Sequence, residues 1–291
     1  MDKILVTGVA GFIGSNLAQF LLNNENCIIY GLDNFSSSTM SNLYPLLKNE
    51  RFHFIEHDLV NEIPISADYI YHCAGCGDFC IYLEDKYKFT IKDFDIFKNI
   101  IEYTRSKNAK LLTLSQFFEY EDKNKDYFQF YDLTILKDGL LSNLILENKI
   151  NAKIIRLGEV YGKNMLKNDS RFIPSSIIKA LNNNEIKINS NIKYSFQYID
   201  DVVQNLAEIM NSNTKEPIIN LTTSSLFSQK EIAQAILSIC NSNSSIIENI
   251  EENEKEYYFT YSNKDNEMIC KTAPDVGLSS TVEHFKLMYF S

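Results

Sequence analysis

The sequence lacks a surplus of basic residues. It has 28 Lys and Arg residues against 38 Asp and Glu residues, which gives a net charge of -10. Proteins that bind nucleic acids ordinarily carry a basic surplus, because lysine and arginine neutralise phosphates. We therefore expect no nucleic-acid partner. An acidic chain can still bind a single nucleotide, since a helix N-terminus offers N–H groups to an anion.

Long apolar runs and a disulfide pattern are also missing. No apolar run approaches the roughly 18 residues that a membrane-spanning helix needs, so no membrane association is expected. The first residues are typical of a buried strand followed by a glycine turn rather than of a cleavable signal. The six cysteines lack scaffold spacing, which favours reduced thiols and a cytoplasmic location.

Short apolar runs alternate with stretches of helical spacing in the first half of the chain. Hydrophobic residues make up 45% of the 291 residues, enough for a large core. The expected strands are 4–7, 27–32, 53–56, 69–73, 110–114 and 153–157, and the expected helices are 12–22, 84–105 and 131–148. This alternation predicts an α/β fold, a Rossmann-type doubly wound parallel sheet.

The pattern changes after Gly162, where the elements become shorter and less regular. Helices are expected at 200–210 and 229–240. We predict a Rossmann domain at 1–165, with about 195–225 folding back onto it. A smaller C-terminal α/β substrate part is expected at 166–194 and 226–291.

A glycine motif follows the first expected strand. Gly8, Gly11 and Gly14 have the spacing G-x-x-G-x-x-G. The first glycine allows a tight turn, the second lets the backbone approach a pyrophosphate, and the third lets the helix pack on the strand. The helix N-terminus at Phe12 and Ile13 would face the phosphates. The motif is weak alone, but it lies between a strand and a helix as dinucleotide binding requires.

Asp33 ends the second expected strand, about 20 residues after the glycines. A carboxylate at this place accepts hydrogen bonds from the ribose hydroxyls of a dinucleotide. A 2′-phosphate would meet a like charge there. The sequence therefore predicts NAD rather than NADP.

Several further segments, together with the glycine motif, resemble the extended short-chain dehydrogenase/reductases that act on nucleotide sugars, the NAD-dependent epimerase/dehydratase family. The similar segments are DNFSS (33–37), HDL (57–59), YHCAG (71–75), RLGEVYG (156–162), FIP (172–174) and FQYIDDV (196–202). The first of them is similar to the cofactor loop of NAD-using epimerases and decarboxylases. The stretches around 117–118 and 159–161 are most similar to CDP-abequose synthase-like 4-ketoreductases.

The resemblance implies a cofactor site and a substrate site. The implied cofactor contacts are Gly8, Gly11, Phe12, Ile13, Gly14, Asp33, Asn34, Phe35, Ser36, Asp58, Leu59, Cys73, Ala74, Gly75 and Tyr131. The implied contacts with the sugar nucleotide are Glu159, Arg171 and Phe172. The implied reaction is hydride transfer between NAD and a sugar carbon, usually C4, by an oxidoreductase or isomerase that serves surface polysaccharide biosynthesis.

The resemblance also implies a homodimer, in which two helices of each subunit form a four-helix bundle. The helices would be those expected from about residues 84 and 131. Their apolar residues include Phe94, Phe97, Ile101, Leu141 and Leu144. These side chains could instead only cover the sheet.

The catalytic half of the family pattern is altered. The family has a tyrosine that moves the hydroxyl proton and a lysine four residues later; Tyr131 matches, but the lysine position is Ile135. Ionising a free tyrosine at neutral pH costs about 4 kcal/mol, which the family lysine partly offsets. Lys137 lies about 120° around the helix from Tyr131 and is not expected to face the site. Lys163 is an alternative source of a cation.

The hydroxyl that contacts the sugar is also displaced. Leu114 occupies the aligned position, and a shift of one residue makes Ser115 the functional group, with Thr113 on the other side. Asp93 and Glu159 stand where the family often has asparagine. These changes leave three hypotheses. The first is an enzyme with altered chemistry, with Tyr131 and Ser115 catalytic, and the second is a catalytically impaired relative that binds NAD or a sugar nucleotide. The third keeps catalysis but assigns the base to another residue, with Tyr131 only positioning the sugar.

A cysteine cluster raises the question of a metal. Cys73, Cys76 and Cys80 follow His72 with the spacing C-x-x-C-x-x-x-C. No fourth ligand is well spaced for zinc or an iron–sulfur cluster. We therefore predict no metal site and interpret the segment as part of the cofactor loop.

Overall fold

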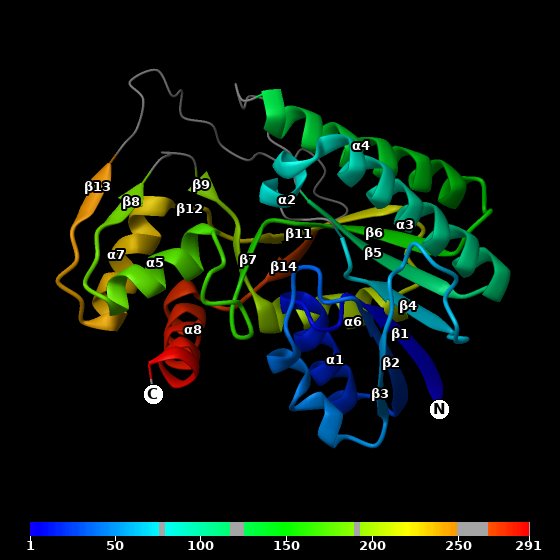
Figure 1. Cartoon of the computed structure of the whole chain (residues 1–291), viewed down its shortest axis with the longest axis horizontal. Coiled ribbons are helices and arrows are strands. Elements are labelled where there is room, and N and C mark those ends of the chain that lie inside the picture. Colours follow the sequence, from blue (N-terminus) through cyan, green and yellow to red (C-terminus); the bar gives the residue numbers. More distant parts are fainter. Residues whose placement is uncertain (76–78, 117–124, 189–192, 249–266, 291) are drawn as a thin grey trace. The chain divides into compact units, whose positions relative to one another are not determined.

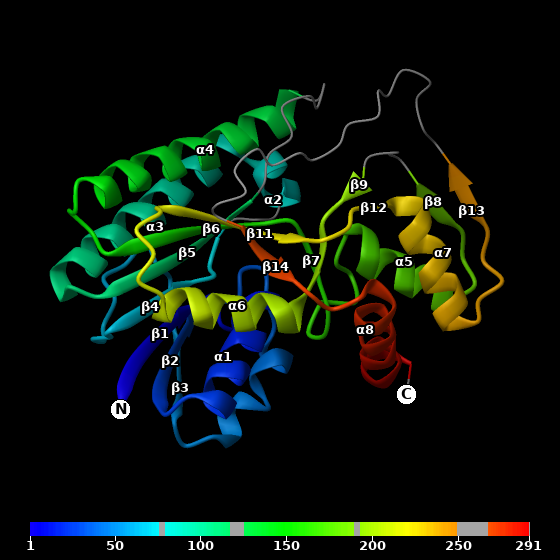
Figure 2. The same ribbon diagram turned by 180° about the vertical axis from the view of Figure 1, so that it is seen from behind.

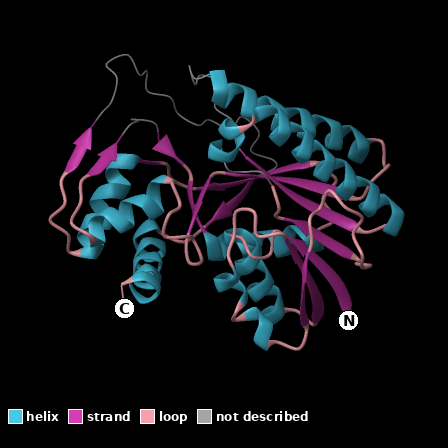
Figure 3. Cartoon of the chain, in the orientation of Figure 1, coloured by secondary structure: helices cyan, strands magenta, loops and turns pink. Residues whose placement is uncertain are grey.

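The computed structural model describes residues 1–75, 79–116, 125–188, 193–248 and 267–290, without side chains at 79–81, 125–131 and 267. Its elements alternate between strands and helices in the first half (Figures 1 and 3). The strands of that half are β1 (Asp2–Thr7), β2 (Cys27–Asp33), β3 (Phe52–Glu56), β4 (Tyr69–His72), β5 (Lys110–Gln116) and β6 (Ala152–Leu157). The helices are α1 (Phe12–Asn24), α2 (Phe79–Glu84), α3 (Lys86–Lys107) and α4 (Lys125–Leu146), with short 3-10 helices at Met40–Leu43 and Leu46–Lys48.

The second half has shorter elements. They are β7 (Glu159–Tyr161), α5 (Phe172–Leu181), β8 (Ile186–Ile188), β9 (Lys193–Tyr194), β10 (Phe196–Tyr198), α6 (Ile199–Asn211), β11 (Ile218–Thr223), β12 (Phe227–Ser228), α7 (Gln229–Cys240), β13 (Ile246–Glu248), β14 (Glu267–Cys270) and α8 (Pro274–Tyr289). Two compact units result. One is residues 1–157 with 203–220, and the other is 158–202 with 221–291.

An eight-stranded sheet has the order β14-β11-β6-β5-β4-β1-β2-β3. Neighbouring strands from β11 to β3 all pair in parallel. The chain first builds outward from β1 to β3 and then returns to build β4, β5 and β6 on the other side of β1. Helices α3 and α4 cover one face of the sheet, and α1 and α6 cover the other (Figures 1 and 2). The doubly wound Rossmann-type fold predicted from the sequence is confirmed.

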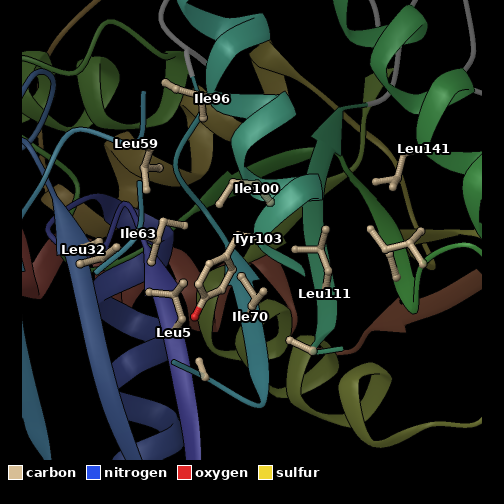
Figure 4. Close-up of a cluster of buried hydrophobic side chains, with 14 of the residues drawn as sticks. Leu5, Leu32, Leu59, Ile63, Ile70, Ile96, Ile100, Tyr103, Leu111 and Leu141 are labelled. Carbon is tan, nitrogen blue, oxygen red and sulfur yellow. The ribbon is translucent and has the colours of Figure 1, made fainter. Parts of the chain in front are cut away.

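One cluster of the core of the first unit lies between the sheet and α3. Figure 4 shows Ile96, Ile100 and Tyr103 of α3 over the sheet residues Leu5 and Ile70. All five side chains are at most 9% exposed. Burying each large apolar side chain contributes about 1.5–3 kcal/mol before the entropic cost of ordering the chain. This buried layer therefore holds α3 against the sheet.

Two helices begin at residues other than those expected. The helix expected from about residue 84 is interrupted, because Asp85 accepts a hydrogen bond from the Lys88 amide as the N-cap of α3. Helix α4 begins at Lys125, six residues earlier than expected. Both α3 and α4 have 22 residues. Neither they nor any other helix in the described segments has the length and apolar character needed to cross a membrane.

Candidate functional site

The turn between β1 and α1 requires glycine at two positions, Gly8 and Gly14. Gly8 has a φ of +67°, and a Cβ there would lie 2.7 Å from the Ala74 amide nitrogen. A Cβ on Gly14 would lie 2.2 Å from the Gly8 carbonyl oxygen. A Cβ on Gly11 would meet only that same oxygen within 4 Å, at 3.1 Å. The backbone at Gly11 is therefore open to a ligand, whereas Gly8 and Gly14 are packed against other backbone atoms of the protein.

The N-terminus of α1 is directed by this turn. The helix begins at Phe12, after Gly11, and its first intrahelical bond runs from the Ser15 amide to the Gly11 carbonyl at 3.1 Å. In this fully described segment the first turn carries no acidic side chain, and Gly11 provides no side-chain cap. The partial positive charge of the helix N-terminus is therefore available to an anion such as a pyrophosphate.

Asp33 joins the glycine turn to the loop after β2. One carboxylate oxygen, Oδ2, accepts from the Ala10 amide at 2.9 Å. The other, Oδ1, accepts from the Phe35 amide at 2.8 Å and the Ser38 hydroxyl at 2.9 Å. Phe35 has a φ of 57°, which turns the loop sharply. A carboxylate offers about four acceptor positions, so Asp33 can still accept from a ligand hydroxyl.

Asp58 and Leu59 in the loop after β3 have different surroundings: Asp58 forms an ion pair, and Leu59 is buried. The Lys92 ammonium lies 2.9 Å from the Asp58 carboxylate, which also accepts from the Val60 amide at 3.3 Å. Burial raises the pKa of Asp58, but these partners outweigh it and hold the pKa below its usual value. The Leu59 side chain is 5% exposed and belongs to the core, so only its backbone can face a ligand.

Thr7 and His72 connect the ends of β1 and β4. The Thr7 hydroxyl lies 2.8 Å from Nδ1 of His72 and accepts from the Ala74 amide at 3.3 Å. Burial, together with the nearby Lys137 ammonium, lowers the pKa of His72 to about 3. Burial raises the pKa of the Cys73 thiol to about 12. Both groups are therefore neutral near pH 7, and the strand end is polar without being charged.

The Ser115 hydroxyl belongs to a buried polar cluster at the end of β5. It donates to the Asp138 carboxylate of α4 at 2.9 Å, and Arg156 of β6 donates to the same oxygen through Nε and Nη2 at 3.0 Å. Ser115 is 6% exposed. Burial raises the pKa of Asp138, although Arg156 and Ser115 oppose the shift. Asp138 therefore fixes the Ser115 side chain at the carboxyl end of the sheet.

Lys137 has a carboxylate partner in the neighbouring helix. Its ammonium lies 2.5 Å from Oδ2 of Asp93 in α3, and the two side chains are 20% and 6% exposed. Ile135, at the position of the family lysine, is half-buried. Lys163, the other candidate cation, pairs with Asp200 at 3.0 Å in the second unit. The side chain of Tyr131 and residues 76 and 117–118 lie outside the described residues.

Within the second unit, the expected substrate residues surround the start of α5. Arg171 is the residue before α5 and binds the Asp169 carboxylate through Nε at 3.0 Å and Nη2 at 2.6 Å. Its Nη1 donates to the Val160 carbonyl at 3.4 Å. Glu159 is exposed and Phe172 is half-buried. Asp169 therefore orients the Arg171 guanidinium. The sequence analysis named Arg171 but did not anticipate this role of Asp169.

Within the first unit, the structure brings the expected cofactor residues to the carboxyl ends of β1, β2, β3 and β4, apart from Tyr131 of α4, whose side chain lies outside the described residues. Sequence reasoning missed two residues that hold this edge, Thr7 and Asp138, and it set Lys137 aside because of its direction around the helix. Thr7 directly precedes the glycine motif, so its position at the strand end was a usable signal. The pairing of Asp138 and Lys137 gave no signal, because their partners lie 18 to 44 residues away along the chain.

The fold and the glycine turn define an α/β protein of the dinucleotide-binding class. The sequence model of the NAD dependent epimerase/dehydratase family matches residues 4–222, and this chain belongs to that family. The resemblance drawn from the motifs is thereby confirmed, and so is NAD as the cofactor, because the family is NAD dependent.

Curated relatives carry the names of decarboxylases. The chain is 28% identical over 262 residues to UDP-glucuronic acid decarboxylase 1 of Danio rerio, covering 84% of this chain but only 62% of that protein. It is 27% identical to UDP-glucuronic acid decarboxylase 3 of Arabidopsis thaliana, covering 82% of this chain and 75% of the relative.

Solved structures of sugar-nucleotide epimerases share the fold. UDP-glucose 4-epimerase from Thermotoga maritima has a TM-score of 0.82 at 18% identity, covering 98% of this chain and 99% of that one. UDP-glucuronic acid 4-epimerase from Bacillus cereus, solved with UDP-glucuronic acid and NAD, has a TM-score of 0.81 at 20% identity, covering 99% and 100%.

Proposed function

We propose that this chain is an NAD-dependent nucleotide-sugar oxidoreductase or epimerase that transfers hydride at C4 of the sugar. The observation that carries the proposal is the link between Asp33 and the glycine turn. The carboxylate binds the Ala10 amide at 2.9 Å and keeps an acceptor position for a ribose. This joins the two features that recognise a dinucleotide, the pyrophosphate cradle and the ribose acceptor.

The residues of the first unit fit NAD along the carboxyl edge of the sheet. The α1 N-terminus would hold the pyrophosphate, with Phe12 and Ile13 in its first turn. Asp33 would accept from the adenosine ribose, with Asn34, Phe35 and Ser36 in the same loop. The second half of the dinucleotide would be held where the strand order reverses, between β1 and β4. There Cys73, Ala74 and Gly75 would border it. When bound, NAD accepts or returns a hydride.

Tyr131 and Ser115 are the proposed catalytic residues. Position 131 precedes Asp138 by seven residues of α4, nearly two turns or about 10 Å along the axis. Since Asp138 reaches the end of β5, position 131 lies beyond the carboxyl edge, where ligands of open α/β sheets bind. The tyrosine would exchange the hydroxyl proton of the sugar, and Ser115 would contact the sugar oxygen.

The substrate is proposed to be a nucleotide-activated sugar used in surface polysaccharide biosynthesis. The support is family membership and the names of relatives that act on UDP-glucuronic acid. Glu159, Arg171 and Phe172 are the proposed contacts. Arg171 is already bound to Asp169, so it would present an oriented guanidinium edge rather than a mobile charge.

A homodimer through α3 and α4 is also proposed. The expected interface residues Phe97, Ile101, Leu141 and Leu144 instead face the core of the subunit. Other apolar side chains of these helices are exposed: Ile91 at 48%, Leu136 at 51% and Leu140 at 42%. They provide the apolar surface that a second copy could cover.

Mass spectrometry of small molecules released from the purified protein tests the cofactor. NAD is the expected species. Incubation with UDP-, GDP-, CDP- and dTDP-sugars, followed by NADH absorbance and product NMR, tests the reaction. Tyr131→Phe should abolish turnover while retaining NAD, whereas Tyr87→Phe, at a side chain 79% exposed, should retain both. Bound NAD without turnover or binding across the whole panel would instead identify a catalytically impaired relative.

A further inference from the structure

Lys137 is an ammonium group kept largely from solvent. Its side chain is 20% exposed, and its partner Asp93 is 6% exposed. Desolvating such a pair consumes much of the attraction between the charges, so the pair is a poor source of stability alone. Apolar side chains of similar volume at these two positions could have joined α3 to α4 without the cost of desolvating two charges. The position of the pair is therefore more informative than its contribution to folding.

The pair lies at the carboxyl ends of β4 and β5. Lys137 directly precedes Asp138, whose carboxylate accepts from Ser115 at the end of β5 at 2.9 Å. His72 ends the neighbouring strand β4, opposite Thr113 of β5 in the register, and the Lys137 ammonium helps to lower the pKa of His72. His72 in turn contacts Thr7, whose hydroxyl binds the amide of Ala74. The ammonium thus borders the strand ends assigned above to the second half of the dinucleotide.

The direction expected from helix spacing applies to the Cβ atom and not to the ammonium. Lys137 is rotated by about 120° from position 131 around α4. A lysine, however, carries its charge on a flexible four-carbon stem. Asp93, buried on the sheet-facing side of α3, fixes the end of that stem. The ammonium is thereby held in the layer between the helices and the sheet.

We propose that Lys137, held by Asp93, supplies the fixed positive charge at the nicotinamide half of the cofactor site, in place of the lysine that the family has at position 135. This inference rests on the proposed function for the presence of NAD, but not on turnover. A positive charge there disfavours the cationic ring of NAD relative to the neutral ring of NADH. Lys137 therefore favours the reduced cofactor, and Asp93 moderates the effect.

The ratio of the dissociation constants of NAD and NADH measures this charge without any sugar substrate. Calorimetric titration of cofactor-free full-length protein with each dinucleotide gives the ratio. Lys137→Met should lower the ratio of the NAD constant to the NADH constant by at least roughly fivefold, which is the effect of a unit charge about 15 Å away at an effective dielectric near 20 and grows at shorter range. Asp93→Asn should raise the ratio. Lys137→Arg should keep it near the wild-type value.

Lys98→Met and Glu102→Gln are matched controls, because this pair lies on the same helix as Asp93 but is 65% and 61% exposed. Neither control should change the ratio. If Lys137→Met and Asp93→Asn change the stability but leave the ratio unchanged, the pair only holds α3 against α4 and the proposal is overturned. If Lys137→Met does not fold, the proposal is still tested by Asp93→Asn, which should raise the ratio, and by Lys137→Arg, which should keep it.

Turnover is measured separately on the nucleotide-sugar panel. If the variants shift the ratio but the wild type shows no turnover, Lys137 is the charge at the cofactor and the proposed function is wrong. If the wild type turns over but the variants leave the ratio unchanged, the proposed function stands and the role of Lys137 is wrong. The double variant Lys137→Met with Ile135→Lys should return the ratio toward wild type, because it restores a lysine at the family position.

Discussion

Thr7 and His72 lie opposite each other in the register of β1 and β4, with the Thr7 hydroxyl 2.8 Å from Nδ1 of His72. The same hydroxyl accepts from the Ala74 amide, which lies directly against Gly8. One neutral histidine thus fixes the loop that closes the glycine turn. Protonation of His72 would place a charge in this buried network.

Acid should destabilise the protein partly through His72. Burial lowers its pKa to about 3, whereas the unfolded value is about 6.5. The contribution to stability is complete above about pH 6.5 and is lost as the pH falls toward 3, since the unfolded state binds the proton first. Between pH 7.5 and 5 the loss is up to about 2 kcal/mol. Urea unfolding at both pH values measures it.

His72→Asn should show a smaller loss between the two pH values than the wild type. His53→Asn, at an exposed ring stacked on Tyr30, should keep the wild-type loss. Equal losses in the His72→Asn variant and the wild type would contradict the assignment.

Gly14→Ala should destabilise the fold and prevent NAD binding. The added Cβ would lie 2.2 Å from the Gly8 carbonyl oxygen, and backbone on both sides restricts relaxation. The expected cost is about 3 kcal/mol. Gly139→Ala is the control, because its Cβ meets nothing within 4 Å in α4 and should stabilise by about 0.5–1 kcal/mol. Urea midpoints and NAD titration compare the two. An unaffected Gly14→Ala protein would show that the turn is looser than described.

Asp33→Asn should weaken NAD binding by about tenfold or more, since a charged acceptor is lost. The amide group also places a donor among the Ala10, Phe35 and Ser38 donors. Discrimination against NADP should fall with the charge. Titration with both dinucleotides measures this. Asp68→Asn, at an exposed carboxylate that accepts from the Lys3 amide at the start of β1, should change neither affinity. Unchanged discrimination in Asp33→Asn would place the ribose elsewhere.

Ser115→Ala should lower turnover by about 100-fold with little change in NAD affinity. Asp138 keeps Arg156, so the loss of stability should be only about 1 kcal/mol. Ser142→Ala provides the comparison in α4: that buried hydroxyl has no hydrogen-bond partner in the described part of the chain. It should remain fully active and no less stable. Full activity in Ser115→Ala would move the hydroxyl role toward Thr113.

Much of the fold and the cofactor half of the site could be predicted from the sequence. Short apolar strands alternating with helices allow few arrangements other than a parallel sheet with right-handed crossovers. Gly8 and Gly14 were recognisable because only glycine tolerates such close backbone contacts. Asp33 was recognisable because its distance from the glycines is set by one helix and one strand. The segmentation around Asp85 was not anticipated, since a single N-cap decided it.

The sequence by itself determined the dinucleotide-binding class, because its signals are local: strand lengths, glycine spacing and one acidic residue. Only the tertiary structure decided how the edge of the sheet is held and charged. Ser115 meets Asp138 across 23 residues, and Lys137 meets Asp93 across 44. Helix spacing predicts that Lys137 faces away from the site, but in the structure its ammonium is directed to Asp93 of α3, which packs beside α4. Such contacts depend on where long side chains end, which the periodicity of the backbone does not specify.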